Sequence, residues 1–195
     1  MPKSVDFYFD YGSPTSYLAY TQMPGLAART GAKVNYLPIL LGGVFQATGN
    51  RSPVEIAAKG KWMRQDLQYF AERYKVRYMW NPHFPINTLP LMRGATYALR
   101  EGFLVPYSDA VFTALWGNAL NMGDPAVVGK ALEEAGLDAQ KIAAATQDQA
   151  VKDALKSATE QAVKRGLFGA PAFFVGERVH FGQDRLPYVE ELLKS

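Results

Sequence analysis

The sequence predicts an α/β protein in which the two ends of the chain build one sheet and the middle is helical. Three observations predict this. Residues 5–40 read as strand, helix and strand, which makes a parallel βαβ unit. Between residues 52 and 145 only helical patterns recur. From residue 172 the chain returns to two short strands and a final helix.

The first predicted strand ends where the first predicted helix begins. Val5, Phe7 and Phe9 alternate with two aspartates and a tyrosine, a period of two that is typical of a strand. Ser13 and Pro14 then mark a helix start, with serine as the cap and proline in the first helical position. Free backbone N–H groups and the helix dipole favour an anion at such a place. Ser13 is therefore either a functional hydroxyl or only a helix cap.

Apolar residues continue this first helix until Gly31, which ends it. Pro24 and Gly25 fall inside the run and are expected to kink or break the helix, because proline lacks the N–H that an interior position needs. A second strand is predicted over roughly residues 33–40, which are rich in valine, tyrosine, leucine and isoleucine.

A glycine-rich stretch, LGGVFQATGNR, occupies residues 41–51 and is predicted to be a loop. Asn50 lies in a Gly-Asn turn there, which is typical of a tight turn. The segment 52–55 matches a capping box with proline in its first turn, and it opens a helix that ends near Tyr74. The basic residues of this helix, Lys59 among them, either form a solvated face or reach an anion.

Residues 78–90 hold three prolines and show no periodicity, which predicts a long irregular loop. The loop carries Asn81, His83 and Asn87. Loops of this length inside a compact domain are often functional, although a packed connector has the same pattern. Thr88 is predicted to cap the helix that follows.

Further helices complete the middle of the chain. Asp124 is predicted to cap one of them. A longer helix from Gln147 places apolar residues at spacings of three and four until Gly166 ends it. The remaining helices are expected at about residues 107–116, 125–134 and 139–145.

The tail is predicted to form a hairpin and a helix. Strands at residues 172–175 and 178–181 flank a turn at Gly176, which is a hairpin pattern. Asp184 is a plausible cap for the last helix, whose leucines and valine form an apolar stripe.

Composition narrows the function. The 195 residues suit one domain or one core with an inserted subdomain, and the net charge of +3 comes from scattered basic residues. Nucleic acid is therefore not the natural partner, and a small anionic ligand fits better. No stretch approaches the roughly 20 apolar residues that span a bilayer, and the N-terminus has no apolar signal core, so a cytoplasmic protein is expected.

Cysteine is absent and histidine occurs only twice. The chain can therefore form no disulfide and offers no thiolate as nucleophile or ligand, and the spacing of His83 and His180 predicts no metal site. If this fold performs thiol chemistry, the sulfur must come from a bound molecule.

The order of elements is similar to that of the thioredoxin fold, and the helical insertion resembles the DsbA-like branch. The resemblance implies a thioredoxin-like domain at residues 1–50 and 146–195 and an inserted all-helical subdomain at 51–145. In that fold the active group lies at the start of the first helix, opposite a cis-proline before the third strand. Here those positions are Ser13 and Pro171, so the Ala170–Pro171 bond is predicted to be cis.

Within that branch the chain resembles the 2-hydroxychromene-2-carboxylate isomerases, relatives of kappa-class glutathione transferases. The motifs that carry the resemblance run from Phe7 to Leu186 and are FYFDYGSPTSYLA, LLGGVFQATGN followed by SP, FGAP, and FGQDRL. The resemblance implies a glutathione-dependent isomerase of an aromatic carboxylate in naphthalene-type catabolism, which acts as a homodimer. Its product would be trans-o-hydroxybenzylidenepyruvate.

The resemblance also implies roles for single residues. Ser13 would hold the glutathione sulfur as a thiolate, which agrees with the lower thiol pKa found at helix N-termini. The other glutathione contacts would be Asn50, Ala170 beside Pro171, Gln183, Asp184 and Arg185. The residues expected to face the substrate are Lys59, Asn81 and Asn87.

Two alternatives remain open beside the isomerase. A kappa-like transferase would conjugate glutathione to electrophiles and consume it, whereas a non-catalytic glutathione- or peptide-binding module would turn over nothing. Disulfide exchange is set aside because cysteine is absent. A serine hydrolase is disfavoured, since no histidine lies near Ser13 in the sequence.

Overall fold

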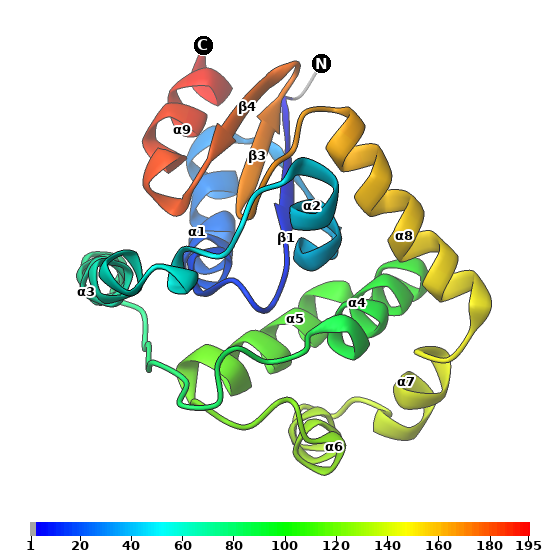
Figure 1. Ribbon diagram of the computed structural model, residues 1–195. Helices are drawn as coiled ribbons and strands as arrows, with labels where there is room; N and C mark the ends of the chain where they lie inside the picture. The colour runs from blue at the N-terminus through cyan, green and yellow to red at the C-terminus, as the bar shows by residue number, and fades with distance from the viewer. Residues whose placement is uncertain (1–2) are drawn as a thin grey trace.

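The computed structural model describes residues 3–195, and their strands form one mixed sheet. The strands lie in the order β2-β1-β3-β4, with β1 parallel to β2 and antiparallel to β3, and β3 antiparallel to β4. Both ends of the chain therefore meet in this sheet (Figure 1). Its strands are β1 (Ser4–Phe9), β2 (Lys33–Pro38), β3 (Ala172–Val175) and β4 (Arg178–Phe181).

The period-two pattern of β1 sorts its side chains onto two faces. On one face Phe7 is fully buried, and its ring stacks on Phe173 of β3 with centroids 5.3 Å apart. On the other face Tyr8 packs edge-on against Phe174, with centroids 5.5 Å apart. The two faces belong to two hydrophobic clusters, a larger one around Phe7 and a smaller one around Tyr8.

Each face of the sheet is covered by helices. The larger cluster contains residues of α1 (Pro14–Thr30) and α9 (Leu186–Lys194). The smaller cluster contains residues of α2 (Leu41–Thr48) and α8 (Gln149–Lys164). Figure 1 shows α1 and α9 together on one side of the strands and α2 and α8 on the other. This arrangement confirms the predicted thioredoxin-like sheet.

Helix α1 continues through Pro24, so the expected break is wrong. Pro24 lies on the exposed side of the helix, whereas Met23 is fully buried and Leu26 nearly so. Packing of these neighbours holds the helix across the missing hydrogen bond. Gly31 ends the helix with φ of 69°, as predicted.

The stretch at residues 41–51 is also corrected, because most of it is helix α2 rather than a loop. The first N–H of the helix, that of Leu41, is bound by the Asp10 carboxylate at 2.8 Å. Val44 is fully buried in the smaller cluster. A distant cap and tertiary packing thus outweigh the low helix propensity of two glycines.

Helix α3 begins later than predicted, and helix α4 begins without the predicted cap. The capping box forms, with the Ser52 N–H bound by Glu55 at 3.1 Å, but it closes a short 3₁₀ turn, and α3 runs over Ala57–Tyr74. Thr88 precedes α4 (Leu89–Glu101) without capping it, because its hydroxyl donates to Asp10 at 2.8 Å instead.

The remaining helices pack beneath the sheet (Figure 1). The predicted cap Asp124 accepts from the Ala126 N–H at 2.9 Å. Asp148 accepts from the Ala150 N–H at 3.0 Å, so α8 starts at Gln149, two residues later than predicted. These helices are α5 (Leu104–Phe112), which a π-helical turn (Thr113–Gly117) extends, α6 (Pro125–Glu134) and α7 (Ala139–Ala145). Together with α3 and α4 they form the helical block.

The helical block and the sheet share one hydrophobic core. Phe112 of α5 lies 5.8 Å from Phe9 of β1 and 4.7 Å from Tyr11, measured between ring centroids. Trp116 is fully buried and donates from its indole nitrogen to the Tyr11 carbonyl at 2.7 Å. Among residues 3–195, no helix has the length and apolar character needed to cross a membrane.

Candidate functional site

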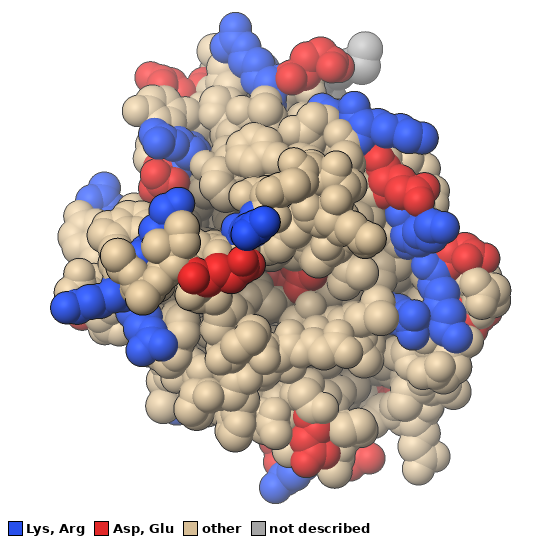
Figure 2. Space-filling view, in the orientation of Figure 1, with Lys and Arg blue, Asp and Glu red and all other residues tan. Residues whose placement is uncertain are grey.

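A cavity of about 790 Å³ opens where α1 begins. Its walls come from the start of α1, the connection between α2 and α3, the first turns of α3, and the segments on either side of the β3–β4 hairpin. Figure 2 shows this face hollowed between the sheet and the helical block, with acidic and basic side chains close together beside the hollow. The predicted site residues that line the cavity are Ser13, Asn50, Lys59, Ala170, Gln183, Asp184 and Arg185.

Ser13 is both a cap and a lining residue. Its Oγ accepts from the Ser16 N–H at 3.1 Å and donates to the Ala170 carbonyl at 3.1 Å. Only 5% of the residue is exposed, and that part borders the cavity. The two interpretations of Ser13 are therefore compatible, because one hydroxyl caps α1 and also lies at the cavity wall.

The predicted cis bond between Ala170 and Pro171 is present. Pro171 is buried behind the wall and accepts from the Gly182 N–H at 3.0 Å, whereas Ala170 lines the cavity itself. A second cis bond, Phe84–Pro85, lies in the proline-rich loop and has no counterpart among the sequence predictions.

Asn50 ties two walls of the cavity together. Its side-chain amide donates to the Phe168 carbonyl at 2.8 Å, and its side-chain oxygen accepts from the Arg51 N–H at 2.8 Å. The residue is exposed, so a ligand in the cavity can reach it.

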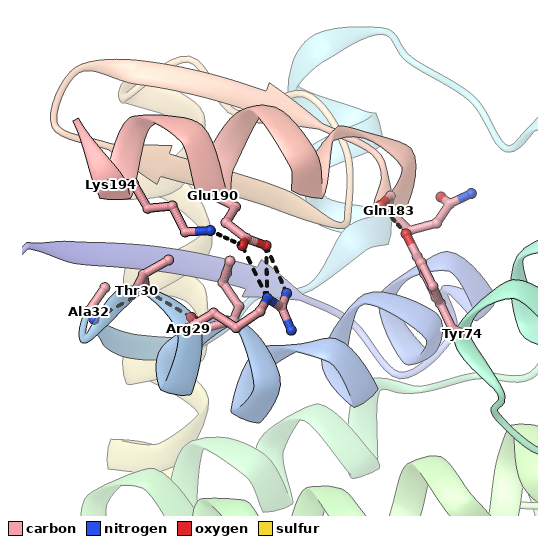
Figure 3. Close-up of polar contacts among 8 residues, drawn as sticks. Arg29, Thr30, Ala32, Tyr74, Gln183, Glu190 and Lys194 are labelled. Atoms are coloured by element: carbon pink, nitrogen blue, oxygen red, sulfur yellow. Dashed lines mark hydrogen bonds and ion pairs between the residues drawn. The ribbon is translucent and has the colours of Figure 1, made fainter.

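The end of the cavity near α9 is built by a 3₁₀ turn at Gln183–Arg185. Tyr74 of α3 donates to the Gln183 carbonyl at 2.8 Å and so holds the turn (Figure 3). The predicted cap role of Asp184 is wrong, because α9 starts at Leu186 with Arg185 at its N-cap and without a side-chain cap bond. The Asp184 carboxylate instead lies 3.6 Å from the Arg185 guanidinium.

Asp66 of α3 joins this end of the cavity, and sequence reasoning missed it. Its carboxylate accepts from the Gln183 side chain at 3.3 Å. Burial and the charge of Asp184 raise the pKa of Asp66. In the sequence Asp66 looks like one more charged residue on a solvated helix face, so only the fold brings it beside Asp184. Two carboxylates and the Arg185 guanidinium suit a ligand group with both charges.

Two residues expected to face the substrate do not line the cavity. Asn81 is fully buried and donates to the carbonyls of Leu115 and Leu120 at 2.9 and 2.8 Å. Asn87 is exposed, and its side chain accepts from the N–H of Leu89, two residues further on. Both asparagines organise the proline-rich loop as a packed connector.

The histidines His83 and His180 are also not among the residues that line the cavity. Ser13 therefore has no imidazole base among the residues that line this cavity. The geometry agrees with the sequence in disfavouring a serine hydrolase.

Asp10 contacts two residues that line the cavity, whereas its sequence pattern predicts only a polar position in a strand. It is 1% exposed, and one oxygen accepts from the Gly12 N–H and the Thr88 hydroxyl, both at 2.8 Å. The other oxygen accepts from the Leu41 N–H. Burial raises the pKa of Asp10, and the three hydrogen bonds oppose that shift. One carboxylate thus joins β1, α2 and α4 around the Gly12–Ser13 turn.

Comparison with known proteins shows the family to which this chain belongs. The family model of the DSBA-like thioredoxin domain matches residues 4–194. The chain is 34% identical over 195 residues to a 2-hydroxychromene-2-carboxylate isomerase of Sphingobium xenophagum, and the alignment covers 99% of each protein. It is 26% identical to glutathione S-transferase kappa 1 of Homo sapiens, over 99% of this chain and 92% of that one.

Solved structures agree with the sequence comparison. A 2-hydroxychromene-2-carboxylate isomerase is similar with a TM-score of 0.85 at 30% identity, covering 96% of this chain and 93% of that one. A probable DsbA oxidoreductase of Streptomyces coelicolor shares the fold, with a TM-score of 0.80 at 18% identity over 98% of this chain and 88% of that one. The DsbA-like fold predicted from the element order is confirmed.

Proposed function

Because this chain belongs to the 2-hydroxychromene-2-carboxylate isomerase family of DsbA-like thioredoxin-fold proteins, we propose that it is a glutathione-dependent isomerase. It would convert 2-hydroxychromene-2-carboxylate to trans-o-hydroxybenzylidenepyruvate. One observation carries the proposal: Ser13, the N-cap of α1, lines the cavity, and its hydroxyl is 3.1 Å from the carbonyl that precedes the cis-proline.

The cavity suits glutathione in size and in the charges around it. Its volume of about 790 Å³ falls within the roughly 300–1,000 Å³ of typical small-ligand sites. The γ-glutamyl end of glutathione carries an ammonium and a carboxylate, which match Asp66 and Asp184 on one side and Arg185 on the other. The backbone of Ala170 would bind the cysteinyl unit as an added strand does, and Asn50 would contact the tripeptide beyond it.

Bound glutathione would supply a thiolate for the ring-opened form of the substrate, adding to the double bond conjugated with the keto group, allowing rotation about the resulting single bond, and leaving again as the trans double bond forms. Ser13 would donate a hydrogen bond to the sulfur. The free N–H groups and the dipole at the start of α1 would lower the thiol pKa from its ordinary value of about 8.5. Lys59, on the wall formed by α3, would attract the substrate carboxylate.

A kappa-like transferase is the second candidate, and the similarity to kappa 1 over nearly the whole chain favours it. The two activities differ in what happens to the thiol. An isomerase returns glutathione after each turnover, whereas a transferase consumes one equivalent per product. Titration of free thiol during turnover separates them.

The test follows the ultraviolet spectrum of 2-hydroxychromene-2-carboxylate with purified protein at graded glutathione concentrations. We expect the rate to rise with glutathione to saturation, without loss of free thiol. S-methylglutathione, which has the same charged ends but no ionisable thiol, should support no turnover. A full rate without any thiol would reject the proposal.

A substitution of Ser13 tests whether its hydroxyl contributes to the rate of isomerisation. Ser13→Ala should lower the rate at least tenfold at saturating glutathione, in line with the loss of one charge-assisted hydrogen bond at the reacting atom, about 1.5–3 kcal/mol. Ser157→Ala on the exposed face of α8 is the matched control and should keep the wild-type rate. An unchanged rate in Ser13→Ala would remove Ser13 from its role.

A further inference from the structure

Thr15 has a polar contact that neither the sequence motifs nor the proposed function uses. Its hydroxyl oxygen lies 2.9 Å from the Ser13 Oγ. It belongs to the first turn of α1, is half-buried, and lines the same cavity as Ser13. A side chain branched at Cβ has few rotamers in a helix, so the hydroxyl stays near Ser13.

The direction of this hydrogen bond follows from counting protons. A serine hydroxyl has one proton and two lone pairs. Ser13 Oγ accepts from the Ser16 N–H, which can only donate, and its own proton goes to the Ala170 carbonyl, which can only accept. The remaining lone pair faces Thr15, so the Thr15 hydroxyl must be the donor.

We propose that Thr15 is a positioning residue that acts through Ser13. By donating to Ser13 Oγ it fills the last lone pair, which leaves the Ser13 proton as the group's only means of bonding a ligand. Two incoming hydrogen bonds also polarise the Ser13 O–H and make it a stronger donor. When an anionic sulfur lies at the helix start, this proton turns from the Ala170 carbonyl to the sulfur. Thr15 and the Ser16 N–H keep the oxygen in place.

This inference rests on the proposed glutathione site, and its test reads the ionisation of the bound thiol rather than turnover. The thiolate absorbance of bound glutathione is titrated against pH in the wild-type protein and in variants. Thr15→Val removes the hydroxyl while keeping the shape and the branch at Cβ. Thr15→Ser keeps the hydroxyl and is the matched control. Affinity for S-methylglutathione reports whether each variant keeps an intact cavity.

We expect Thr15→Val to weaken ionisation of the bound thiol about three- to tenfold, the effect of one ordinary hydrogen bond. Thr15→Ser should stay close to the wild type, and all variants should bind S-methylglutathione equally. In a Ser13→Ala background, Thr15→Val should have no further effect, because Thr15 acts through the missing hydroxyl.

Three results would overturn the inference in distinguishable ways. A Thr15→Val protein with the wild-type thiol pKa would show that the hydroxyl is not needed. An equal effect of Thr15→Val with and without Ser13 would show that Thr15 contacts the ligand directly. A wild-type protein that does not lower the pKa of bound glutathione would overturn the proposed function and the inference together.

Discussion

A buried carboxylate needs hydrogen-bond donors for both of its oxygens, and Asp10 has three: two on one oxygen and one on the other. Each of the three comes from a different part of the chain, so Asp10 fixes the turn that presents Ser13. Nothing in the local sequence distinguishes it from Asp6, which follows the same alternation in the strand. Its role depends on contacts 31 and 78 residues away, which single-sequence patterns do not contain.

Substitution of Asp10 tests this role. Asp10→Asn replaces one acceptor oxygen with an NH₂ group, so at least one of the three donors must face another donor. We expect a loss of about 1–3 kcal/mol in the free energy of unfolding, the cost of a buried polar group without a partner. Urea denaturation measures it. Asp153→Asn on the exposed surface of α8 is the control and should change stability by less than about 0.5 kcal/mol. Equal stabilities of the two variants would contradict the account.

At the scale of elements, α4 and α5 pack closely at Gly94. A Cβ at this position would overlap the buried ring of Tyr107, whose hydroxyl donates to the Leu91 carbonyl at 2.9 Å. We expect Gly94→Ala to destabilise the protein by about 1–3 kcal/mol through overpacking, despite the better helix propensity of alanine.

Gly129 of α6 is the matched control for that substitution. It also lies inside a helix, but a Cβ there would meet nothing within 4 Å. Gly129→Ala should therefore stabilise the protein by about 0.4–1 kcal/mol. Thermal unfolding of both variants gives the comparison, and a Gly94→Ala protein as stable as the wild type would show that the two helices can move apart.

Ion pairs at the protein surface join α9 to the last turn of α1 (Figure 3). Glu190 lies 2.8 Å from Arg29 and 2.6 Å from Lys194. Hydrogen bonds from Arg29 and then Lys194 lower the pKa of Glu190 from 4.5 to about 2. Because the pKa is lower in the folded chain, this stabilisation is present above pH 4.5 and is lost as the pH falls toward about 2.

Glu190→Gln should therefore lower the free energy of unfolding near neutral pH by at most about 1 kcal/mol, since the partner side chains Arg29 and Lys194 are about half exposed to solvent. The difference from the wild type should shrink as the pH falls below 4.5 and also as salt is added. Urea denaturation at several pH values tests this. A difference that is independent of both pH and salt would point to packing instead of charge.

Sequence patterns predicted the elements that depend on local chemistry. The cap at Ser13, the end of α1 at Gly31 and the hairpin around Gly176 follow from the residues themselves. The patterns failed where a partner far along the chain decides. Helix α2 starts on a distant carboxylate, and Thr88 donates away from its own helix.

The candidate site divides in the same way. The residues carried by specific motifs, Ser13 and Ala170 among them, do line one cavity. The proline-rich loop has no periodicity from which to place its side chains, and two of its residues predicted to face the substrate, Asn81 and Asn87, do not line the cavity. Asp66 was missed because its neighbour Asp184 is brought near only by the fold.

For the molecule as a whole, the shared core means that sheet and helical block depend on each other. Phe112 of α5 packs against aromatic rings of β1 and α1, among them Phe9 and Tyr20. Phe112→Ala should lower the free energy of unfolding by about 3–5 kcal/mol, because it leaves a cavity in this core. Unfolding of the wild type and the variant should remain a single transition by both far-ultraviolet circular dichroism and tryptophan fluorescence. Two separate transitions would show that the helical block folds on its own.

In the proposed function, the start of α1 holds the glutathione sulfur beside the Ser13 hydroxyl. A crystal structure of the protein with glutathione tests this most directly. We expect the sulfur within hydrogen-bond distance of Ser13 Oγ, with the γ-glutamyl end between Asp66, Asp184 and Arg185. Glutathione bound in the opposite direction, or with its sulfur away from Ser13, would contradict it.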